Sequence, residues 1–409
     1  MEEKRERAVL AVVDTGDYDI EESLDELRSL CETAGAEVVG EIVQKREAPD
    51  SSGYLGTGKL LEAKELCEML EADVLIADTE LTGSKQRNME RVVGVDVIDR
   101  TTLILDIFAL SAKTAEGKLQ VELAQLNYRL PRLAGSSESL SRLGGGIGTR
   151  GPGESKLESD RRYVRERIKN LKERLLELEK RREVTRVQRG KSKIPVVALV
   201  GYTNVGKSSL LNALTGADIL AEDKLFATLD PTVRKLEIPD FCTVLLVDTV
   251  GFVSRLPHTL VDAFKSTLEE VSRADLILKI VDASDKNWFS QLEITEKVIG
   301  ELGAAATQSL VVFNKCDKID TQKALCGICV SAKTGDGLCK LTEEVAKILS
   351  ERIVRCSIML PFDSLALGAY IREFGDVISE SCEEDGMHME VSIAKEYFAK
   401  IERFAKDKK

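Results

Sequence analysis

The residues best suited to chemistry form a run at positions 201–208 with the sequence Gly-Tyr-Thr-Asn-Val-Gly-Lys-Ser. This run matches G-x-x-x-x-G-K-[ST], a loop that cradles phosphates. An apolar stretch at 194–200 precedes it as an expected buried strand, and 209–214 follows as the start of a helix. Glycines let successive N–H groups turn toward phosphates, and the helix N-terminus adds positive potential. We expect Lys207 to neutralise the β- and γ-phosphates and the Ser208 hydroxyl to ligate Mg²⁺.

A second phosphate element follows the apolar run 241–247, an expected strand that ends at Asp248-Thr249-Val250-Gly251. Asp248 is expected to hold Mg²⁺ through water, and the N–H of Gly251 to meet the γ-phosphate. That bond exists only in the triphosphate state, so it can order or release the loop that follows. Upstream, residues 226–232 (Phe-Ala-Thr-Leu-Asp-Pro-Thr) would supply a threonine ligand to Mg²⁺. Spacing alone does not decide whether this ligand is Thr228 or Thr232.

Base choice is indicated by residues 314–317, Asn-Lys-Cys-Asp, after the apolar run 309–313. The carboxylate of Asp317 can accept from guanine N1–H and N2–H₂ together. Adenine lacks both donors, and leaving a buried acid unpaired is costly, so this position selects guanine. Lys315 can lay its alkyl stem over the base.

A last element, Ser-Ala-Lys at 331–333, follows an expected strand at 325–330 and would offer the N–H of Ala332 to guanine O6. Four such motifs in this order predict GTP binding on a doubly wound α/β sheet. The residues expected to contact GTP are Gly201, Tyr202, Thr203, Asn204, Val205, Gly206, Lys207, Ser208, Ser209, Phe226, Ala227, Thr228, Leu229, Asp230, Asp248, Thr249, Val250, Gly251, Asn314, Lys315, Cys316, Asp317, Ser331, Ala332 and Lys333.

Phe252 departs from a common pattern, because many GTPases carry glutamine after this glycine to orient the attacking water. Phenylalanine cannot do this, so we expect slow intrinsic hydrolysis that a partner or an ion stimulates. Asn204 matches a position at which some glutamine-less GTPases hold K⁺ near the phosphates; alternatively, it only suits the loop conformation. The expected catalytic set is Lys207, Thr228, Asp248, Gly251 and Asn204, and the expected Mg²⁺ ligands are Ser208, Thr228 and Asp248.

Composition sets broad limits on the protein. A chain of 409 residues with 43% hydrophobic and 31% charged residues is expected to form two to four globular domains. No apolar run has membrane-spanning length and the N-terminus shows no signal-peptide pattern, so we expect a cytoplasmic protein. Nine cysteines suit a reducing compartment, with the Cys326/Cys329 pair packed in a core rather than on a metal, and two histidines leave little for zinc.

Charge is spread unevenly along the chain. The net charge is −12 overall, −12 over residues 1–149, +8 over residues 150–193 and −8 over the remainder. One basic segment within an acidic protein indicates nucleic acid as the first candidate partner.

The elements that must position these residues begin with alternating strands and helices, which predict a small parallel α/β unit. Expected strands are 8–13, 37–43, 73–77 and 95–98, and expected helices are 20–33 and 58–70.

Two leucine-rich helices are expected next, forming an antiparallel hairpin. Between them, residues 134–156 are too rich in glycine to form a core, and they carry Arg142, Arg150 and Lys156 toward phosphates. The alternative is a plain linker with a solvated charged helix. The first stripe is Leu119, Leu123, Leu126 and Leu130, and the second is Val164, Ile168, Leu171, Leu175 and Leu178.

Four domains follow from this survey: 1–110 (N-terminal α/β), 111–193 (helical hairpin), 194–355 (GTPase) and 356–409 (a small α+β domain). In the last domain, 363–373 and 394–404 are expected to be helical, and 377–382 and 387–392 to be strands.

The chain resembles the HflX family of ribosome-associated GTPases, most specifically in Gly-Gly-Gly-Ile-Gly-Thr-Arg-Gly-Pro-Gly-Glu at 144–154. The runs 226–232, 248–252, 99–101 (Asp-Arg-Thr) and 119–126 add to the likeness, which spans roughly residues 1–355. The resemblance selects Thr228 over Thr232. It implies a protein that docks with GTP on the large ribosomal subunit, can split stalled ribosomes and brings the hairpin loop to rRNA. We expect the protein to be a monomer. The expected RNA contacts are Arg142, Arg150, Lys156, Arg161, Arg162 and Arg165.

Three other interpretations stay open at this point. The chain could serve another RNA process such as subunit assembly, or be a GTP-dependent module that binds proteins. A second nucleotide site, driving an ATP-dependent activity, could also lie in the glycine loops of residues 1–193.

Overall fold

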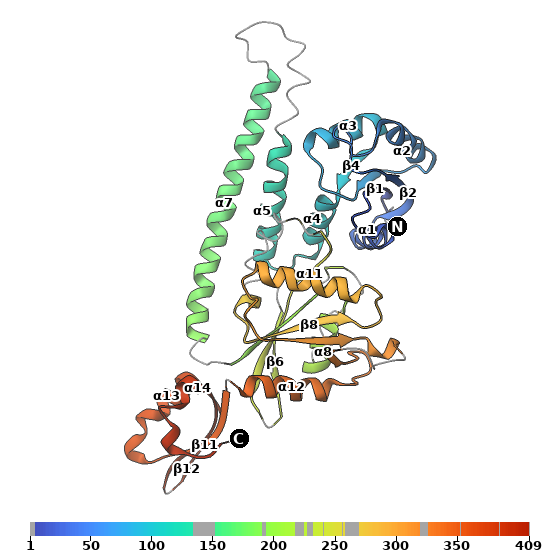
Figure 1. Ribbon diagram of the computed structural model, residues 1–409. Helices are drawn as coiled ribbons and strands as arrows, with labels where there is room; N and C mark the ends of the chain where they lie inside the picture. The colour runs from blue at the N-terminus through green and yellow to red at the C-terminus, as the bar shows by residue number, and fades with distance from the viewer. Residues whose placement is uncertain are drawn as a thin grey trace. The chain divides into compact units, whose positions relative to one another are not determined.

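We analysed a computed structural model of the chain (Figure 1). It describes residues 5–133, 152–189, 194–216, 225–226, 232–239, 241–255, 257, 270–319, 326–351, 353–383 and 385–408. The chain divides into two compact units. The first comprises residues 1–176, 224–229 and 255–264, and the second comprises 177–223, 230–254 and 265–409.

The first unit contains a four-stranded parallel sheet with the order β2-β1-β3-β4, as the alternating pattern predicted. A helix follows each strand, and α1 shows how such a helix is bounded: Asp19 accepts from the N–H groups of Glu21 and Glu22, and Gly35 ends the helix at φ 88°. The elements are β1 (Arg7–Asp14), α1 (Ile20–Ala34), β2 (Glu37–Lys45), α2 (Thr57–Met69), β3 (Val74–Ala77), α3 (Gly83–Val93), β4 (Asp96–Asp99) and α4 (Arg100–Ser111).

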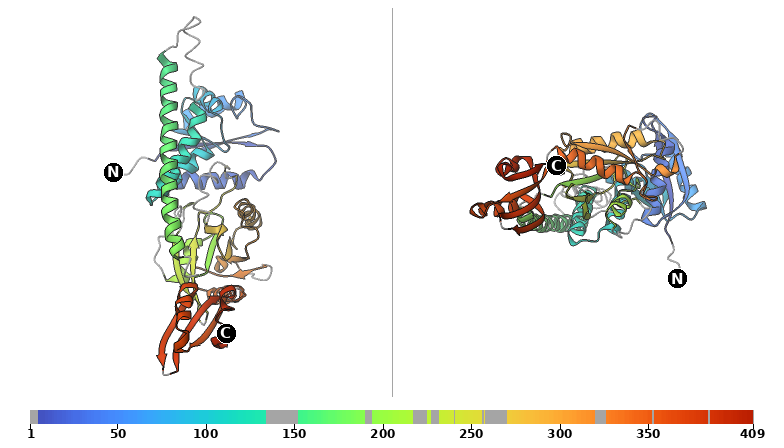
Figure 2. Two further views of the ribbon diagram at one scale, coloured as in Figure 1. Left: turned by 90° about the vertical axis from the view of Figure 1, so that its left-hand side faces the viewer. Right: turned by 90° about the horizontal axis from the view of Figure 1, so that it is seen from below.

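The helical pair consists of α5 (Ala115–Arg132) and the long α7 (Pro152–Arg189), which run beside each other in Figures 1 and 2. Arg167 of α7 forms a bidentate ion pair with Glu122 of α5 at 2.7 and 2.9 Å. On α7 the predicted stripe is correct, since Ile168 and Leu171 are buried.

On α5 the predicted leucine stripe is not the most buried face of the helix. Leu119, Leu123, Leu126 and Leu130 are only half-buried. The helix packs mainly on α4, so its innermost face holds small and polar residues that allow close approach, and leucine spacing could not reveal it. That buried face is Gly117, Gln120, Val121, Ala124 and Tyr128.

The second unit contains a six-stranded sheet with the order β10-β9-β8-β5-β7-β6, in which only β6 runs antiparallel. Alternate residues of β5 enter cores on opposite faces: Val197 and Leu199 pack with α8 and α12, and Ala198 and Val200 with α11. The doubly wound fold is therefore confirmed. Its elements are β5 (Val196–Gly201), α8 (Lys207–Thr215), β6 (Thr232–Glu237), β7 (Thr243–Asp248), β8 (Leu276–Asp282), α11 (Trp288–Glu301), β9 (Ser309–Asn314), β10 (Ile328–Cys329) and α12 (Leu338–Ser350).

Two strands differ from expectation. β10 covers only two of the residues expected at 325–330, because Gly327 lies against the carbonyl of Val311 and only the next two residues pair with β9. β7 begins two residues late, because Phe241 and Cys242 form the turn from β6.

The C-terminal region is a four-stranded antiparallel sheet with the order β12-β13-β11-β14. The strands β12 (Gly375–Glu383) and β13 (Gly386–Ala394) and the helix α13 (Ala366–Phe374) match expectation. The central strand β11 (Ile353–Leu360) and the edge strand β14 (Ala405–Lys408) were not expected. The helix expected at 394–404 is wrong, since only α14 (Lys395–Phe398) and a 3₁₀ turn (Glu402–Phe404) form there before the chain turns into β14. Phe398 and Ile401 are buried against the sheet in that short segment.

Candidate functional site

The phosphate loop joins the end of β5 to the first turn of α8, as predicted. Gly201 has no room for a side chain, because a Cβ there would lie 2.3 Å from the carbonyl oxygen of Ile280. Gly206 has φ 87°, and a Cβ there would lie 2.4 Å from Nδ2 of Asn314. Asn204 also takes a left-handed conformation, at φ 59°, which asparagine tolerates better than most residues. The loop is therefore shaped by backbone contacts that only these residue types allow.

Lys207 lies at the start of α8 with its amino group turned back into the loop. Its Nζ donates to the carbonyl oxygens of Tyr202 at 2.7 Å and Gly201 at 3.1 Å. Burial lowers the pKa of this amino group to about 8, while the charge of Asp248 opposes the shift. A bound triphosphate would replace two neutral carbonyl partners with anionic oxygens, which favour the charged amine.

The expected Mg²⁺ residues meet at the carboxyl end of β7. The Ser208 hydroxyl donates to Oδ2 of Asp248 at 2.6 Å, and Asp248 is buried. Two hard oxygen donors side by side fit Mg²⁺, which would neutralise phosphate charge when bound. Thr228 lies outside the described residues, as do Ala227, Leu229 and Asp230.

The chain after Asp248 lies directly against the phosphate loop. The Thr249 hydroxyl donates to the carbonyl of Leu199 at 2.7 Å. A Cβ at Gly251 would lie 2.8 Å from Cα of Thr203 and 2.9 Å from Nζ of Lys207, so glycine is required for this approach. The backbone N–H of position 251 is thus held beside the lysine expected to contact the same phosphate.

The side chain of Phe252 lies in the protein core. Its N–H donates to the carbonyl of Gly201 at 3.1 Å, and its carbonyl accepts from Thr203 at 2.7 Å. Its side chain is buried in the core formed by Val200 and Ala274. No catalytic water can be oriented by this side chain, as its residue type suggested.

The expected guanine-binding residues gather at the ends of β9 and β10. Asn314 joins them to the phosphate loop, because its Nδ2 donates to the carbonyl of Val205 at 2.8 Å and its Oδ1 accepts from Ala332 at 3.0 Å. The Ala332 N–H therefore already has a partner, which it would exchange to serve guanine O6. The hydroxyl of Ser331 donates to Asp317 at 2.7 Å, and this bond lowers the pKa of the Asp317 carboxyl.

Lys315 takes a left-handed backbone conformation and connects the expected guanine-binding residues to the phosphate loop. Its Nζ donates to the carbonyl of Asn204 at 2.8 Å and forms an ion pair with Asp282, also at 2.8 Å. Asp282 was not predicted, although a carboxylate ending the apolar strand β8 was a visible signal. Of the remaining expected residues, Val205, Val250 and Cys316 are buried, Tyr202 and Ser209 are half-buried, and Lys333 is exposed.

Comparisons with known proteins show which family the chain belongs to. Four family models match successive parts of the chain: GTP-binding GTPase N-terminal (residues 21–109), GTP-binding GTPase Middle Region (111–189), 50S ribosome-binding GTPase (196–315) and HflX C-terminal domain (317–407). GTPase HflX from Caldanaerobacter subterraneus subsp. tengcongensis is 49% identical over 98% of this chain and 94% of its own length. The chain belongs to the HflX family of GTPases.

Other members of the HflX family are similar over nearly the full chain. GTPase HflX of Escherichia coli K12 is 42% identical over 93% of this chain and 92% of its own length. Among solved structures, SsGBP in complex with GDP is 27% identical, covers 85% of this chain and 99% of that chain, and has a TM-score of 0.48. The reaction of this HflX-family chain is GTP hydrolysis.

The expected RNA-contacting residues of this HflX-family chain are only partly described. Arg162 and Arg165 are exposed and lie three residues apart on α7, so they are neighbours on one side of the helix, and Arg161 is half-buried. The Nη1 atom of Arg165 lies 3.9 Å from Oε1 of Glu158. Lys156 belongs to α7, but its side chain lies outside the described set, as do Arg142 and Arg150. Among the described helices, none is both long and apolar enough to cross a membrane.

The lowered pKa of Lys207 predicts how GTP affinity depends on pH. Below about pH 8 the amine is charged before GTP binds, whereas above it binding must take up a proton. GTP affinity should therefore fall between pH 8 and pH 9, approaching tenfold per unit, as measured by calorimetry. Lys207→Arg should bind more weakly with a flatter profile, because guanidinium stays charged. A wild-type affinity that is constant to pH 9 would contradict this assignment.

Asp317→Asn should change the preferred base. The side-chain NH₂ group of asparagine donates hydrogen bonds, and it would face the N2–H₂ group of guanine, which also donates. Xanthine has a carbonyl oxygen in place of that group, and this oxygen can accept from the asparagine. GTP affinity should fall roughly 100-fold or more, and affinity for xanthosine triphosphate should rise. Asp285→Asn, the same change on a carboxylate before α11, should leave both affinities as in the wild type. Equal GTP binding by Asp317→Asn and wild type would remove Asp317 from base recognition.

Proposed function

We propose that this protein is a GTP-dependent switch that binds the large ribosomal subunit and dissociates or rescues stalled ribosomes. The observation that carries ribosome binding is the basic segment 150–193, with net charge +8 in a chain of net charge −12. Arg162 and Arg165 hold exposed guanidinium groups on α7 within it. Such a surface suits rRNA phosphates, whereas the acidic remainder disfavours nonspecific adhesion.

The match to the 50S ribosome-binding GTPase model, over residues 196–315, supports the same partner. In this proposal the γ-phosphate is sensed by Thr228 and by the N–H of Gly251. The glycine-rich run before α7 then brings Arg142, Arg150 and Lys156 to rRNA. Subunit assembly is the alternative use of the same chemistry, and binding to precursor rather than mature subunits would favour it.

Co-sedimentation tests this proposal. With a non-hydrolysable GTP analogue, the protein should sediment with large subunits more strongly than with GDP, and binding should weaken steeply as salt increases. The triple variant Arg142→Ala, Arg150→Ala and Lys156→Ala should lose ribosome binding while keeping its GTP affinity.

The matched control removes three exposed cations elsewhere on α7, at Lys172, Arg174 and Lys180. It should retain most of the ribosome binding. Equal binding with GDP and with the analogue would refute the switch, and equal loss in both triple variants would refute the assigned location.

Hydrolysis is proposed to be slow in the free protein and stimulated by the ribosome and by K⁺. Phe252 is buried in the core, and the exposed Asn204 belongs to the phosphate loop, where its carbonyl oxygen accepts from Lys315. An amide oxygen there could help hold a cation beside the phosphates.

We therefore expect several-fold faster GTP hydrolysis in K⁺ buffer than in Na⁺ buffer. Asn204→Gly keeps the left-handed backbone while removing the amide, so it should abolish the difference. Asn287→Ala, before α11, should preserve it. Equal wild-type rates in the two buffers would eliminate the K⁺ role.

A further inference from the structure

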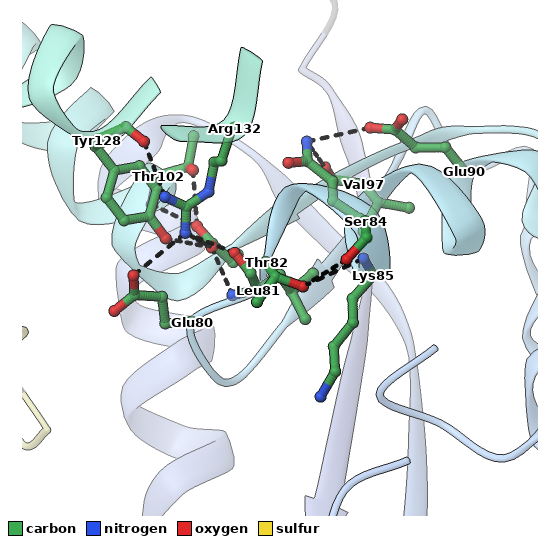
Figure 3. Close-up of polar contacts among 12 residues, drawn as sticks. Glu80, Leu81, Thr82, Ser84, Lys85, Glu90, Val97, Thr102, Tyr128 and Arg132 are labelled. Carbon is green, nitrogen blue, oxygen red and sulfur yellow. Dashed lines mark hydrogen bonds and ion pairs between the residues drawn. The ribbon is translucent and has the colours of Figure 1, made fainter. Parts of the chain in front are cut away.

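Asp99 illustrates how buried polar groups of the first unit engage one another. At the carboxyl ends of β3 and β4, its carboxylate accepts from the N–H of Leu81 at 2.8 Å and from the hydroxyl of Tyr128. Arg132 donates to the carbonyl of Leu81 at 2.6 Å (Figure 3). Such a network stabilises the fold through its own hydrogen bonds. The second unit holds two groups with a further reaction open to them, the thiols of Cys316 and Cys329.

Cys329 faces the side of the sheet on which Cys316 lies. Successive residues of a strand face opposite sides, and Ile328 packs in the core with α12. Cys329 accordingly packs on the other side, against the small cluster that contains Phe313 and Cys316. The C-x-x-C spacing predicts that Cys326 and Cys329 pack together in a core, but this prediction is wrong for Cys326, which is exposed. The neighbour of Cys329 in the fold is Cys316 instead.

The backbone around Phe313 fixes this arrangement. Cys329 lies opposite Phe313 in the register of β10 with β9. The carbonyl of Phe313 accepts from the N–H of Val330 at 2.8 Å and from the thiol of Cys316 at 3.2 Å. The N–H of Cys316 donates to the carbonyl of Val330 at 3.1 Å. These hydrogen bonds hold the two segments that carry the cysteines against each other.

The two thiols also interact directly. Burial raises the pKa of the Cys316 thiol to about 12, and a hydrogen bond between the side chains of Cys316 and Cys329 adds to this rise. Cys316 is buried, whereas Cys329 is half-buried. A reagent in solution therefore reaches Cys329 more readily, and Cys316 lies beside it as a second thiol.

This thiol pair lies between the residues expected to recognise guanine. Cys316 stands between Lys315 and Asp317 in the sequence, and Cys329 precedes Ser331 by two residues. The hydroxyl of Ser331 donates to Asp317 at 2.7 Å, so the same two segments meet again at the carboxylate expected to accept from guanine. A change in the separation of Cys316 and Cys329 should therefore displace Asp317.

We propose that Cys316 and Cys329 form a reversible disulfide that weakens guanine nucleotide binding. The oxidant is the disulfide of a small thiol. The thiolate of Cys329 attacks one of its sulfurs, expels the first small thiolate and leaves Cys329 in a mixed disulfide. Cys316 then attacks Sγ of Cys329 and expels the second small thiolate. Two protein thiols are oxidised to one disulfide, the small disulfide is reduced to two thiols, and these take up the protons that the cysteines lose.

The length of the new bond explains the loss of affinity. An S–S bond is about 2.05 Å long, and thiols joined only by a hydrogen bond lie farther apart, so the two segments must move together. Asp317 and Ser331 would shift with them, and a group that recognises a base through two hydrogen bonds tolerates little displacement. By reciprocity, bound GDP should favour the free thiols. The inference rests on the expected role of Asp317 and is independent of ribosome binding.

The test treats the full chain with oxidised glutathione, removes the reagent, and measures GDP affinity by calorimetry and disulfide linkage by peptide mass mapping. In the wild type, the map should show the bond between Cys316 and Cys329. GDP affinity should fall about tenfold or more and return after dithiothreitol. In a glutathione redox buffer, added GDP should lower the fraction of protein that carries this disulfide.

Cys329→Ser should bind GDP equally well before and after oxidation, because it cannot form the disulfide. It keeps the exposed Cys326, Cys339 and Cys382, so it also measures the effect of modifying other thiols. The matched control is Cys326→Ser, which removes an exposed cysteine close to Cys329 in sequence and should respond to the oxidant as the wild type does. A map without the bond between Cys316 and Cys329 would overturn the proposal. An unchanged GDP affinity in protein that carries this bond would overturn it as well.

Discussion

The pairing of β5 with β7 is the constraint on which the nucleotide site depends. In this parallel register Leu199 lies opposite Asp248, and the pairing continues past both strands: the Thr249 hydroxyl bonds to Leu199, and the backbone of Phe252 bonds to Gly201 and Thr203. The segment expected to meet the terminal phosphate thus continues the sheet and lies along the phosphate loop. This close packing explains why position 251 has no room for a Cβ, and why the hydroxyl of Ser208 meets the carboxylate of Asp248.

Buried charge serves two different purposes in the two units. In the second unit, Lys207 is buried beside carbonyl oxygens and has its pKa lowered, so its environment improves when an anionic phosphate arrives. In the first unit, Asp78 and Arg100 already neutralise each other within the protein. The first arrangement is incomplete without a ligand. The second is complete within the protein, and this difference separates a site that awaits a ligand from an internal contact.

The parts of the site that could be predicted from sequence are those whose chemistry is local. The ends of the apolar runs predicted Asp248 and Asn314, and the spacing of the glycines predicted the phosphate loop. These predictions were possible because each motif directly follows the strand that supports it. The pairing of Asp78 with Arg255 spans 177 positions, and no periodicity or spacing marks it. The inner face of α5 was missed for a related reason, since Gly117 and Gln120 are buried by contact with α4 rather than by their own hydrophobicity. In the C-terminal region, β14 was missed because its short polar sequence becomes a strand only by pairing with β11.

The orientation of Phe252 shows how the path of the backbone limits what this residue can contribute to catalysis. Two backbone hydrogen bonds hold this residue to the phosphate loop, and its side chain completes the core behind the sheet. A glutamine in this backbone conformation would place its amide in that core, not beside the phosphates, so the residue type and the backbone path are matched to each other. Rapid hydrolysis therefore requires a group from outside this segment.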